Sequence, residues 1–123
     1  MSDAESGFRE WRFYVEDMLK FCDKVLMYTA GLDKHTFLSE QRTYDATLRN
    51  LELIGEAATH VPNEVRNAHS DVPWHAIIGT RNRLAHGYLH ISDDVIWSII
   101  QDAIPNLVLS LRNLLDAADE DPA

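Results

Sequence analysis

Hydrophobic residues recur every three or four positions along most of this chain, which is the spacing of an α-helix that buries one face. The first such run extends from residue 8 to about residue 30, and Gly31 is typical of the position just beyond a helix end. Ser39 is a favourable N-cap for a second run that continues to about residue 60. The pattern therefore predicts two long helices in the first half of the chain.

Shorter helical segments are expected on either side of the second run. Asp33 or Thr36 can begin a single helical turn, and Pro62 opens a segment that ends near His69. No part of the chain has a convincing alternating pattern of the kind that predicts a β-strand.

Two more helices are predicted in the second half. Ser70 or Asp71 can cap the first of them, with Pro73 in its first turn and an end near Gly87. The last helix begins at residue 92 or 93 and runs to about residue 118. Pro105 lies inside it and should kink it, because proline removes a helical hydrogen bond and clashes with the preceding turn.

The residues expected to form the core are apolar or small and follow one stripe of each helix. They are Trp11, Tyr14, Val15, Met18, Leu19, Cys22, Val25, Leu26, Tyr44, Leu48, Leu51, Ile54, Gly55, Ala58, Trp74, Ile77, Ile78, Leu84, Ala85, Ile96, Ile99, Ile100, Ala103, Ile104, Leu107, Leu111 and Leu114. The pattern predicts an all-α fold, an antiparallel bundle of about four to five helices. A single domain spans residues 1–123, with frayed tails expected at 1–7 and 117–123.

Composition narrows the class of protein. An apolar fraction of 46% and a charged fraction of 25% are typical of a globular domain. No 18-residue apolar run is present, and the acidic first ten residues do not resemble a signal peptide, so we expect a cytoplasmic protein without a membrane segment. The single cysteine, Cys22, cannot form an intramolecular disulfide and fits a core position.

The formal net charge of −9 argues against a general nucleic-acid binder, because such binding depends on neutralising phosphates with lysine and arginine. The charge is unevenly distributed. Residues 41–92 carry five basic and five acidic side chains, whereas residues 93–123 carry one basic and seven acidic side chains. A local cationic site is therefore expected in the middle of the chain. Pairing two protomers would be the simplest way to pool its cations.

The segment from Arg81 to Tyr88 has the most reactive combination of side chains. It contains Arg81, Asn82, Arg83, His86 and Tyr88 near the end of a predicted helix. Arginine can bind phosphate oxygens in a fork, and histidine can transfer a proton near neutral pH. These residue types suit chemistry on a phosphodiester.

The spacing of this segment raises a geometric question. Arg81 and His86 are five positions apart, which separates them by about 140° on a straight helix, whereas Asn82 and His86 share a face. Either Gly87 ends the helix early enough to redirect His86, or Arg81 acts with the histidine of a second protomer. A purely structural role is an alternative, because arginine, histidine and glycine are all common at helix C-termini.

A second cluster of polar side chains lies on the preceding helix. Glu52, Glu56 and His60 are four positions apart on one face and superficially resemble metal ligands. A di-metal helical bundle would use two Glu-x-x-His pairs and further carboxylates, and those pairs are missing from the sequence. Salt bridges and hydrogen bonds between helices are the favoured interpretation, and no metal site or cofactor is predicted.

Several blocks of the sequence together resemble a known family. They are Tyr44-Asp45-Ala46, the segment Arg49-Asn50-Leu51-Glu52-Leu53-Ile54-Gly55-Glu56-Ala57, the segment Val72-Pro73-Trp74-His75-Ala76-Ile77-Ile78-Gly79, the motif Arg81-x4-His86-x-Tyr88, and Trp97. In this order they are similar to the HepT-type members of the HEPN group, which are small all-helical ribonuclease toxins with an Arg-x(4–6)-His signature. The resemblance covers roughly residues 8–115.

The resemblance implies a metal-independent endoribonuclease that works as a homodimer, with the motif helices meeting in a cleft. It assigns Arg81 and His86 to catalysis and Asn82 to orienting them, and we expect Arg83 to bind the RNA substrate, for example tRNA or mRNA. In this chemistry an RNA 2′-OH attacks the adjacent phosphorus. His86 transfers a proton and Arg81 stabilises the phosphoryl charge.

The resemblance also implies a partner, a minimal nucleotidyltransferase antitoxin in a type VII-like toxin–antitoxin pair. That enzyme would add AMP to Tyr88, and the added phosphate would compete with substrate beside Arg81 and His86. Packing of Tyr88 over the helix end is the structural alternative. Some HEPN relatives are non-catalytic subunits that bind a nucleotide or the nucleotidyltransferase, and this remains the alternative function.

Overall fold

The computed structural model describes residues 3–87 and 91–120, with side chains described from residue 10 to residue 119 within those ranges. The long helices are α1 (Asp3–Thr29), α3 (Gln41–Thr59) and α7 (Ile104–Glu120). The shorter helical elements are α2 (Lys34–Ser39), α4 (Asn63–Ala68), α5 (Trp74–Ala85), α6 (Asp93–Ser98) and the π-helical turn η2 (Ile99–Ala103). No strand occurs in the described ranges, so the predicted all-α fold is confirmed.

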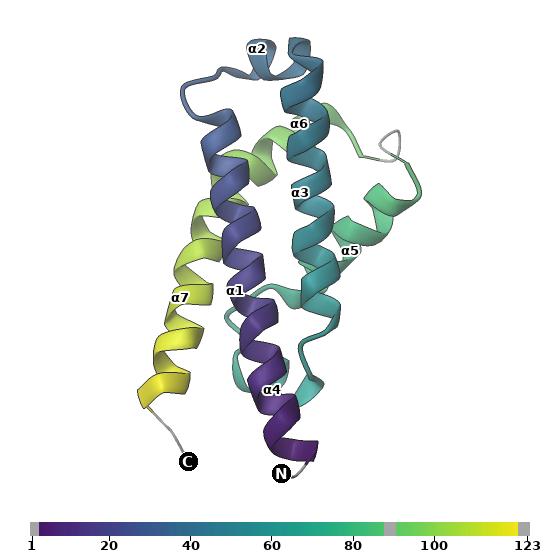
Figure 1. Ribbon diagram of the computed structural model, residues 1–123. Helices are drawn as coiled ribbons and strands as arrows, with labels where there is room; N and C mark the ends of the chain where they lie inside the picture. The colour runs from purple at the N-terminus through teal and green to yellow at the C-terminus, as the bar shows by residue number, and fades with distance from the viewer. Residues whose placement is uncertain (1–2, 88–90, 121–123) are drawn as a thin grey trace.

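The helices form a bundle around α1 (Figure 1). α3 lies antiparallel to α1, and α7 packs along the other side of α1. α5 crosses α3 obliquely and diverges from the bundle toward its own C-terminus. α5 is therefore held against the rest of the molecule mainly by α3, and its C-terminal end projects from the bundle.

Most of the predicted core positions are buried. Val15, Met18, Cys22 and Val25 of α1 have no exposed surface, and Leu48 and Ala58 of α3 are likewise fully covered. Burial raises the pKa of the Cys22 thiol to about 12, with a smaller contribution from the neighbouring charge of Asp23. Cys22 is thus a small apolar core residue, as predicted.

Two predicted core positions are wrong. Ala85 and Ala103 are exposed, whereas Val108, which was not expected in the core, is buried. Ala85 is the last residue of α5, where that helix has already diverged from α3. Ala103 belongs to the π-helical turn, which changes the angular spacing of the side chains.

The connection between α2 and α3 differs from the prediction in its capping. Asp33 is the N-cap of α2 and accepts a 2.8 Å hydrogen bond from the Thr36 backbone N–H, which lowers the pKa of Asp33. Ser39, however, is not an N-cap. It ends α2 and its hydroxyl donates to the Thr36 carbonyl at 2.9 Å, leaving Glu40 to precede α3 without a side-chain cap.

The start of α5 is also set differently from the prediction. Pro73, rather than Ser70 or Asp71, occupies the N-cap position. The buried Trp74 side chain follows, and its indole N–H donates to the His69 carbonyl at 3.0 Å. This bond ties the beginning of α5 to the end of α4, so that the two helices share a fixed corner.

The final helical segment begins as predicted and bends before Pro105. Ser92 caps α6 and accepts a 3.2 Å hydrogen bond from the Val95 backbone N–H. The π-helical turn follows, in which the Ile104 N–H bonds to the Ile99 carbonyl, and the segment changes direction between α6 and α7 (Figure 1). Pro105 has no N–H and cannot donate the backbone hydrogen bond that an α-helix would have at this position. The wider π-helical turn before it accommodates the missing bond.

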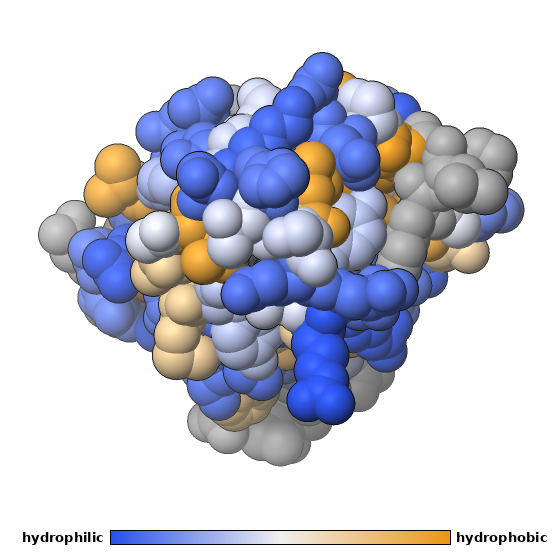
Figure 2. All heavy atoms as spheres, turned by 90° about the horizontal axis from the view of Figure 1, so that it is seen from above, coloured by the Kyte–Doolittle hydropathy of each residue, from blue (hydrophilic) through white to orange (hydrophobic). Residues whose placement is uncertain are grey.

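Apolar side chains on the surface are dispersed. Seen from the α2 end, most of the surface is hydrophilic, with separate small apolar patches (Figure 2). Phe13, Met27, Val95 and Leu109 are the large apolar residues that stand exposed among the described side chains. No described helix combines the length and the hydropathy required to cross a membrane.

Candidate functional site

The candidate site depends on a close approach between α3 and α5. Gly55 is buried on α3, and a Cβ atom added there would overlap the Cβ of Arg81 and lie 2.9 Å from the Ile77 carbonyl oxygen. Only glycine fits between the two backbones without displacing one of them. The absence of a side chain at residue 55 therefore sets the position of Arg81.

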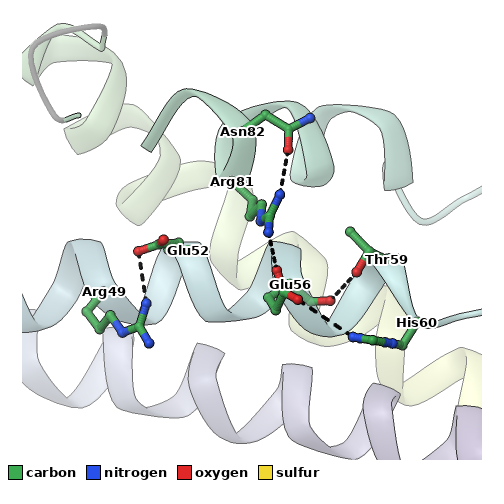
Figure 3. A network of polar contacts seen from close by, with 7 residues as sticks. All are labelled: Arg49, Glu52, Glu56, Thr59, His60, Arg81 and Asn82. Carbon is green, nitrogen blue, oxygen red and sulfur yellow. Dashed lines mark hydrogen bonds and ion pairs between the residues drawn. The ribbon is translucent and has the colours of Figure 1, made fainter. Parts of the chain in front are cut away.

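From this position Arg81 contacts Glu56, the residue that follows Gly55 on α3. Its Nη2 atom lies 2.5 Å from Oε2 of Glu56, and the two side chains are 33% and 44% exposed (Figure 3). The other oxygen of Glu56 lies 3.6 Å from Nε2 of His60, whose ring stacks on Tyr14 with centroids 4.6 Å apart. Glu56 therefore lies between one permanent cation and one imidazole.

The second arm of the guanidinium contacts the neighbouring side chain. Nη1 of Arg81 donates to Oδ1 of Asn82 at 3.0 Å, so the guanidinium lies between the carboxylate on α3 and the carboxamide on α5 (Figure 3). Two contacts from two directions restrict the side chain far more than one contact would. Asn82 is itself exposed.

His86 lies at the exposed C-terminus of α5. The helix ends at Ala85, His86 has the nearly helical dihedral angles φ −88° and ψ 0°, and Gly87 follows with φ +114°. The Gly87 N–H bonds to the Leu84 carbonyl at 3.0 Å, which closes the helix end. Gly87 thus closes the helix end directly after the C-cap residue His86, whose side chain is exposed there.

Within the described residues, no hydrogen bond or ion pair joins Arg81 to His86. Arg83 is exposed in the last turn of α5, and Tyr88 lies outside the described residues. One chain therefore brings Arg81, Asn82 and Glu56 into contact and leaves His86 on the solvent side of the same helix.

The alternative cluster on α3 is occupied by ion pairs. Glu52 lies 3.1 Å from the Arg49 guanidinium, and Glu56 contacts Arg81 and His60. Among the described residues, no group of three or more histidine, cysteine or acidic side chains could hold a metal ion. Glu52 and Glu56 thus form salt bridges on this face, as predicted, and the pair between Glu56 and Arg81 joins two helices.

Comparison with known proteins decides the family. A model of the family described as "Ribonuclease HepT-like" matches residues 18–114. The chain belongs to the HepT-like ribonuclease family. The predicted HepT-type resemblance and ribonuclease class are therefore confirmed, and the matched residues include all five candidate site positions, which are Arg81, Asn82, Arg83, His86 and Tyr88.

Individual relatives agree with this assignment. The chain is 35% identical over 104 residues to "Putative RNase TTE0752" of Caldanaerobacter subterraneus subsp. tengcongensis, covering 85% of this chain and 93% of that protein. It is 30% identical over 99 residues to "Probable ribonuclease HepT" of Thermococcus cleftensis, covering 80% and 90% respectively. No solved structure gives a significant match.

In this HepT-like ribonuclease, the sequence draws attention to Glu56 only as a member of the metal-like cluster with Glu52 and His60. It does not indicate the pairing with Arg81, which is 25 positions away on another helix. Gly55, a small residue in the middle of a buried stripe, is the sequence feature that could have indicated the pairing of Glu56 with Arg81. Such a residue indicates close backbone approach at that level of the helix.

Proposed function

We propose that this HepT-like protein is a metal-independent endoribonuclease toxin of a type VII-like toxin–antitoxin pair. The observation that carries the proposal is the restrained Arg81 guanidinium. It is held between Glu56 and Asn82, and the exposed His86 follows five residues later. In-line phosphodiester cleavage requires a fixed cation for the phosphoryl charge and an accessible imidazole for proton transfer.

In the proposed reaction, the 2′ oxygen of an RNA ribose forms a bond to the adjacent phosphorus, and the bond from phosphorus to the 5′ oxygen breaks. The products are a 2′,3′-cyclic phosphate and a 5′-OH. One proton leaves the 2′-OH and one reaches the 5′ oxygen, and His86 carries one of these two protons. Arg81 stabilises the negative charge that grows on the phosphoryl oxygens.

We further propose that the working site is composite and forms in a homodimer. Arg81 and His86 share no hydrogen bond or ion pair within the described part of one chain, and a separation of five residues corresponds to about 140° on a straight α-helix. A second protomer facing α5 could bring its own His86 to the Arg81 of the first. It would also combine two cationic segments in a protein whose net charge is −9.

The proposed regulation acts at Tyr88. A minimal nucleotidyltransferase antitoxin would transfer AMP from a nucleoside triphosphate. The Tyr88 oxygen attacks the α-phosphorus and pyrophosphate leaves. The new phosphodiester adds a negative charge two residues from His86 and would occupy the place of the substrate phosphate. This step rests on the HepT-type motif, because Tyr88 lies outside the described residues.

The experiment compares the unmodified protein with its His86→Ala variant on total RNA and on tRNA in excess EDTA. Intact mass first confirms that Tyr88 carries no AMP. Cleavage by the parent alone, leaving 2′,3′-cyclic phosphate ends, is the expected result. If the unmodified parent leaves RNA intact, the alternative function follows, a non-catalytic subunit that binds a nucleotide or the nucleotidyltransferase.

A further inference from the structure

A groove of about 790 Å³ lies at the corner between α4 and α5. It is lined by one side of α4, by the connection that follows it, and by the first turns of α5 as far as Asn82. This volume is within the range of small-ligand sites. The α4–α5 groove is separate from the contact between Arg81 and Glu56, which lies on the side of α5 that faces α3.

The groove combines an apolar floor with a rim of carboxamides. Val72 and Trp74 are buried beneath it, and Asn63 and Asn67 are exposed on α4 at its edge. Within the described residues, neither of these two asparagine side chains has a hydrogen-bond partner. An apolar lining beside groups that both donate and accept hydrogen bonds suits a nucleobase, which has apolar faces and a polar edge.

The charge of the groove also favours RNA. No described residue that lines it is aspartate or glutamate, although the chain has 20 acidic residues. Glu64 and Asp71 are adjacent in sequence to lining residues but do not line the groove. Arg66 does line it, and its guanidinium donates to the backbone carbonyls of Val61 and Thr59 at 2.9 and 3.1 Å. Because these partners are neutral carbonyls and not carboxylates, they hold the guanidinium of Arg66 in place without neutralising its positive charge.

Asn82 connects the groove to the candidate catalytic residues. It lines one end of the groove and accepts the hydrogen bond from Arg81 at 3.0 Å. It also lies four positions before His86, and His75, Ile78 and Gly79 precede it on the same side of α5. A chain lying along this side of α5 from His86 would therefore enter the groove.

We propose that the α4–α5 groove binds an unpaired nucleotide of the RNA substrate, one that adjoins the phosphodiester cleaved at Arg81 and His86. This proposal rests on the proposed ribonuclease function and adds a substrate class, namely RNA that is single-stranded next to the cleavage site. The carboxamides at the rim read the edge of the base, and Arg66 attracts the backbone phosphate.

The test introduces one carboxylate into the groove and one elsewhere. Asn67→Asp and, separately, Asn63→Asp place it at the rim, while Asn113→Asp, at an exposed position on α7, is the control with the same change of charge. Fluorescence anisotropy measures binding of a randomised single-stranded RNA pool that is 2′-O-methylated and so cannot be cleaved. Circular dichroism and sedimentation check the fold and the subunit composition of each variant.

The expected result is that each groove variant binds the pool about tenfold more weakly than the parent, whereas the Asn113→Asp control changes binding by less than twofold. Equal affinities for parent and groove variants would overturn the proposal, even if the parent cleaves natural RNA. So would dissociation of an oligomer by the groove variants alone, because the groove would then be a contact between subunits. Conversely, weakened binding without any cleavage by the parent would support the groove and reject the proposed function.

Discussion

Arg81 on α5 and Glu56 on α3 form an ion pair, with Nη2 and Oε2 2.5 Å apart, between two helices that cross at Gly55. The Arg81 and Glu56 side chains are 33% and 44% exposed, so water screens their attraction. The pair therefore contributes only about 0–1 kcal/mol to stability. Its importance lies in orientation. The carboxylate holds one arm of the guanidinium while Asn82 holds the other.

Replacing Glu56 by glutamine should therefore reduce activity more than stability. We expect kcat/KM for RNA cleavage to fall by about tenfold to a hundredfold because Arg81 loses its orientation, with a change in unfolding free energy below about 1 kcal/mol. The matched control is Glu52→Gln, one helical turn away, which breaks only the pair with Arg49. Equal losses of activity in the two variants would contradict a specific role for Glu56.

Arg81→Lys tests the fork rather than the charge. Lysine keeps the positive charge but cannot contact Glu56 and Asn82 with two planar arms. We expect RNA cleavage to fall about a hundredfold, the usual scale for losing a group that stabilises a developing oxyanion. Arg112→Lys on the exposed side of α7 should leave the rate unchanged. A rate close to the parent's in Arg81→Lys would mean that a point charge suffices.

Gly55→Ala should destabilise the fold. The added methyl group would overlap Arg81 Cβ and meet the Ile77 carbonyl at 2.9 Å, so α3 and α5 must separate, at a cost of about 1–3 kcal/mol. Gly79→Ala is the control, because a Cβ there meets nothing within 4 Å and alanine favours a helix by about 0.5–1 kcal/mol. Urea unfolding measures both changes. The prediction fails if Gly55→Ala is as stable as the parent.

Cys22 should be unreactive in the folded protein and should make stability fall at high pH. Burial raises its pKa to about 12 from 9.0, so the unfolded chain loses the thiol proton first as the pH rises. Its contribution to stability is present below pH 9 and is lost between about pH 9 and 12. Thiol titration with and without denaturant at pH 8, and unfolding curves of the parent and Cys22→Ala across this range, measure the effect.

The fold could be predicted from the sequence because the spacing of apolar residues within each long helix shows which of its faces is buried. The stripe from Val15 to Val25 and the stripe from Leu48 to Ala58 both follow from residues within one element. The errors arose where a neighbouring element decides the outcome. Ser39 resembles an N-cap in isolation, but α2 ends there and its Thr36 carbonyl takes the hydroxyl.

The sequence indicates the candidate residues but not their contacts. The segment from Arg81 to Tyr88 stands out by its side-chain chemistry, and the resemblance to HepT-type proteins supplies the roles expected of its residues. The pairing with Glu56 depends on how α5 crosses α3, and the groove depends on the corner fixed by Trp74 and His69. Both features depend on how two helices are placed relative to each other, and the spacing of apolar residues within one helix does not predict that placement.

The placement of charge has a consequence for how this protein meets RNA. Its net charge of −9 repels a polyanion at long range, while the phosphate contacts proposed for Arg66 and Arg81 would act only at short range. Salt screens the long-range repulsion more than the close contacts. Moderate ionic strength should therefore speed the encounter with RNA, the reverse of what basic nucleic-acid-binding proteins show, and random RNA should occupy the protein only briefly.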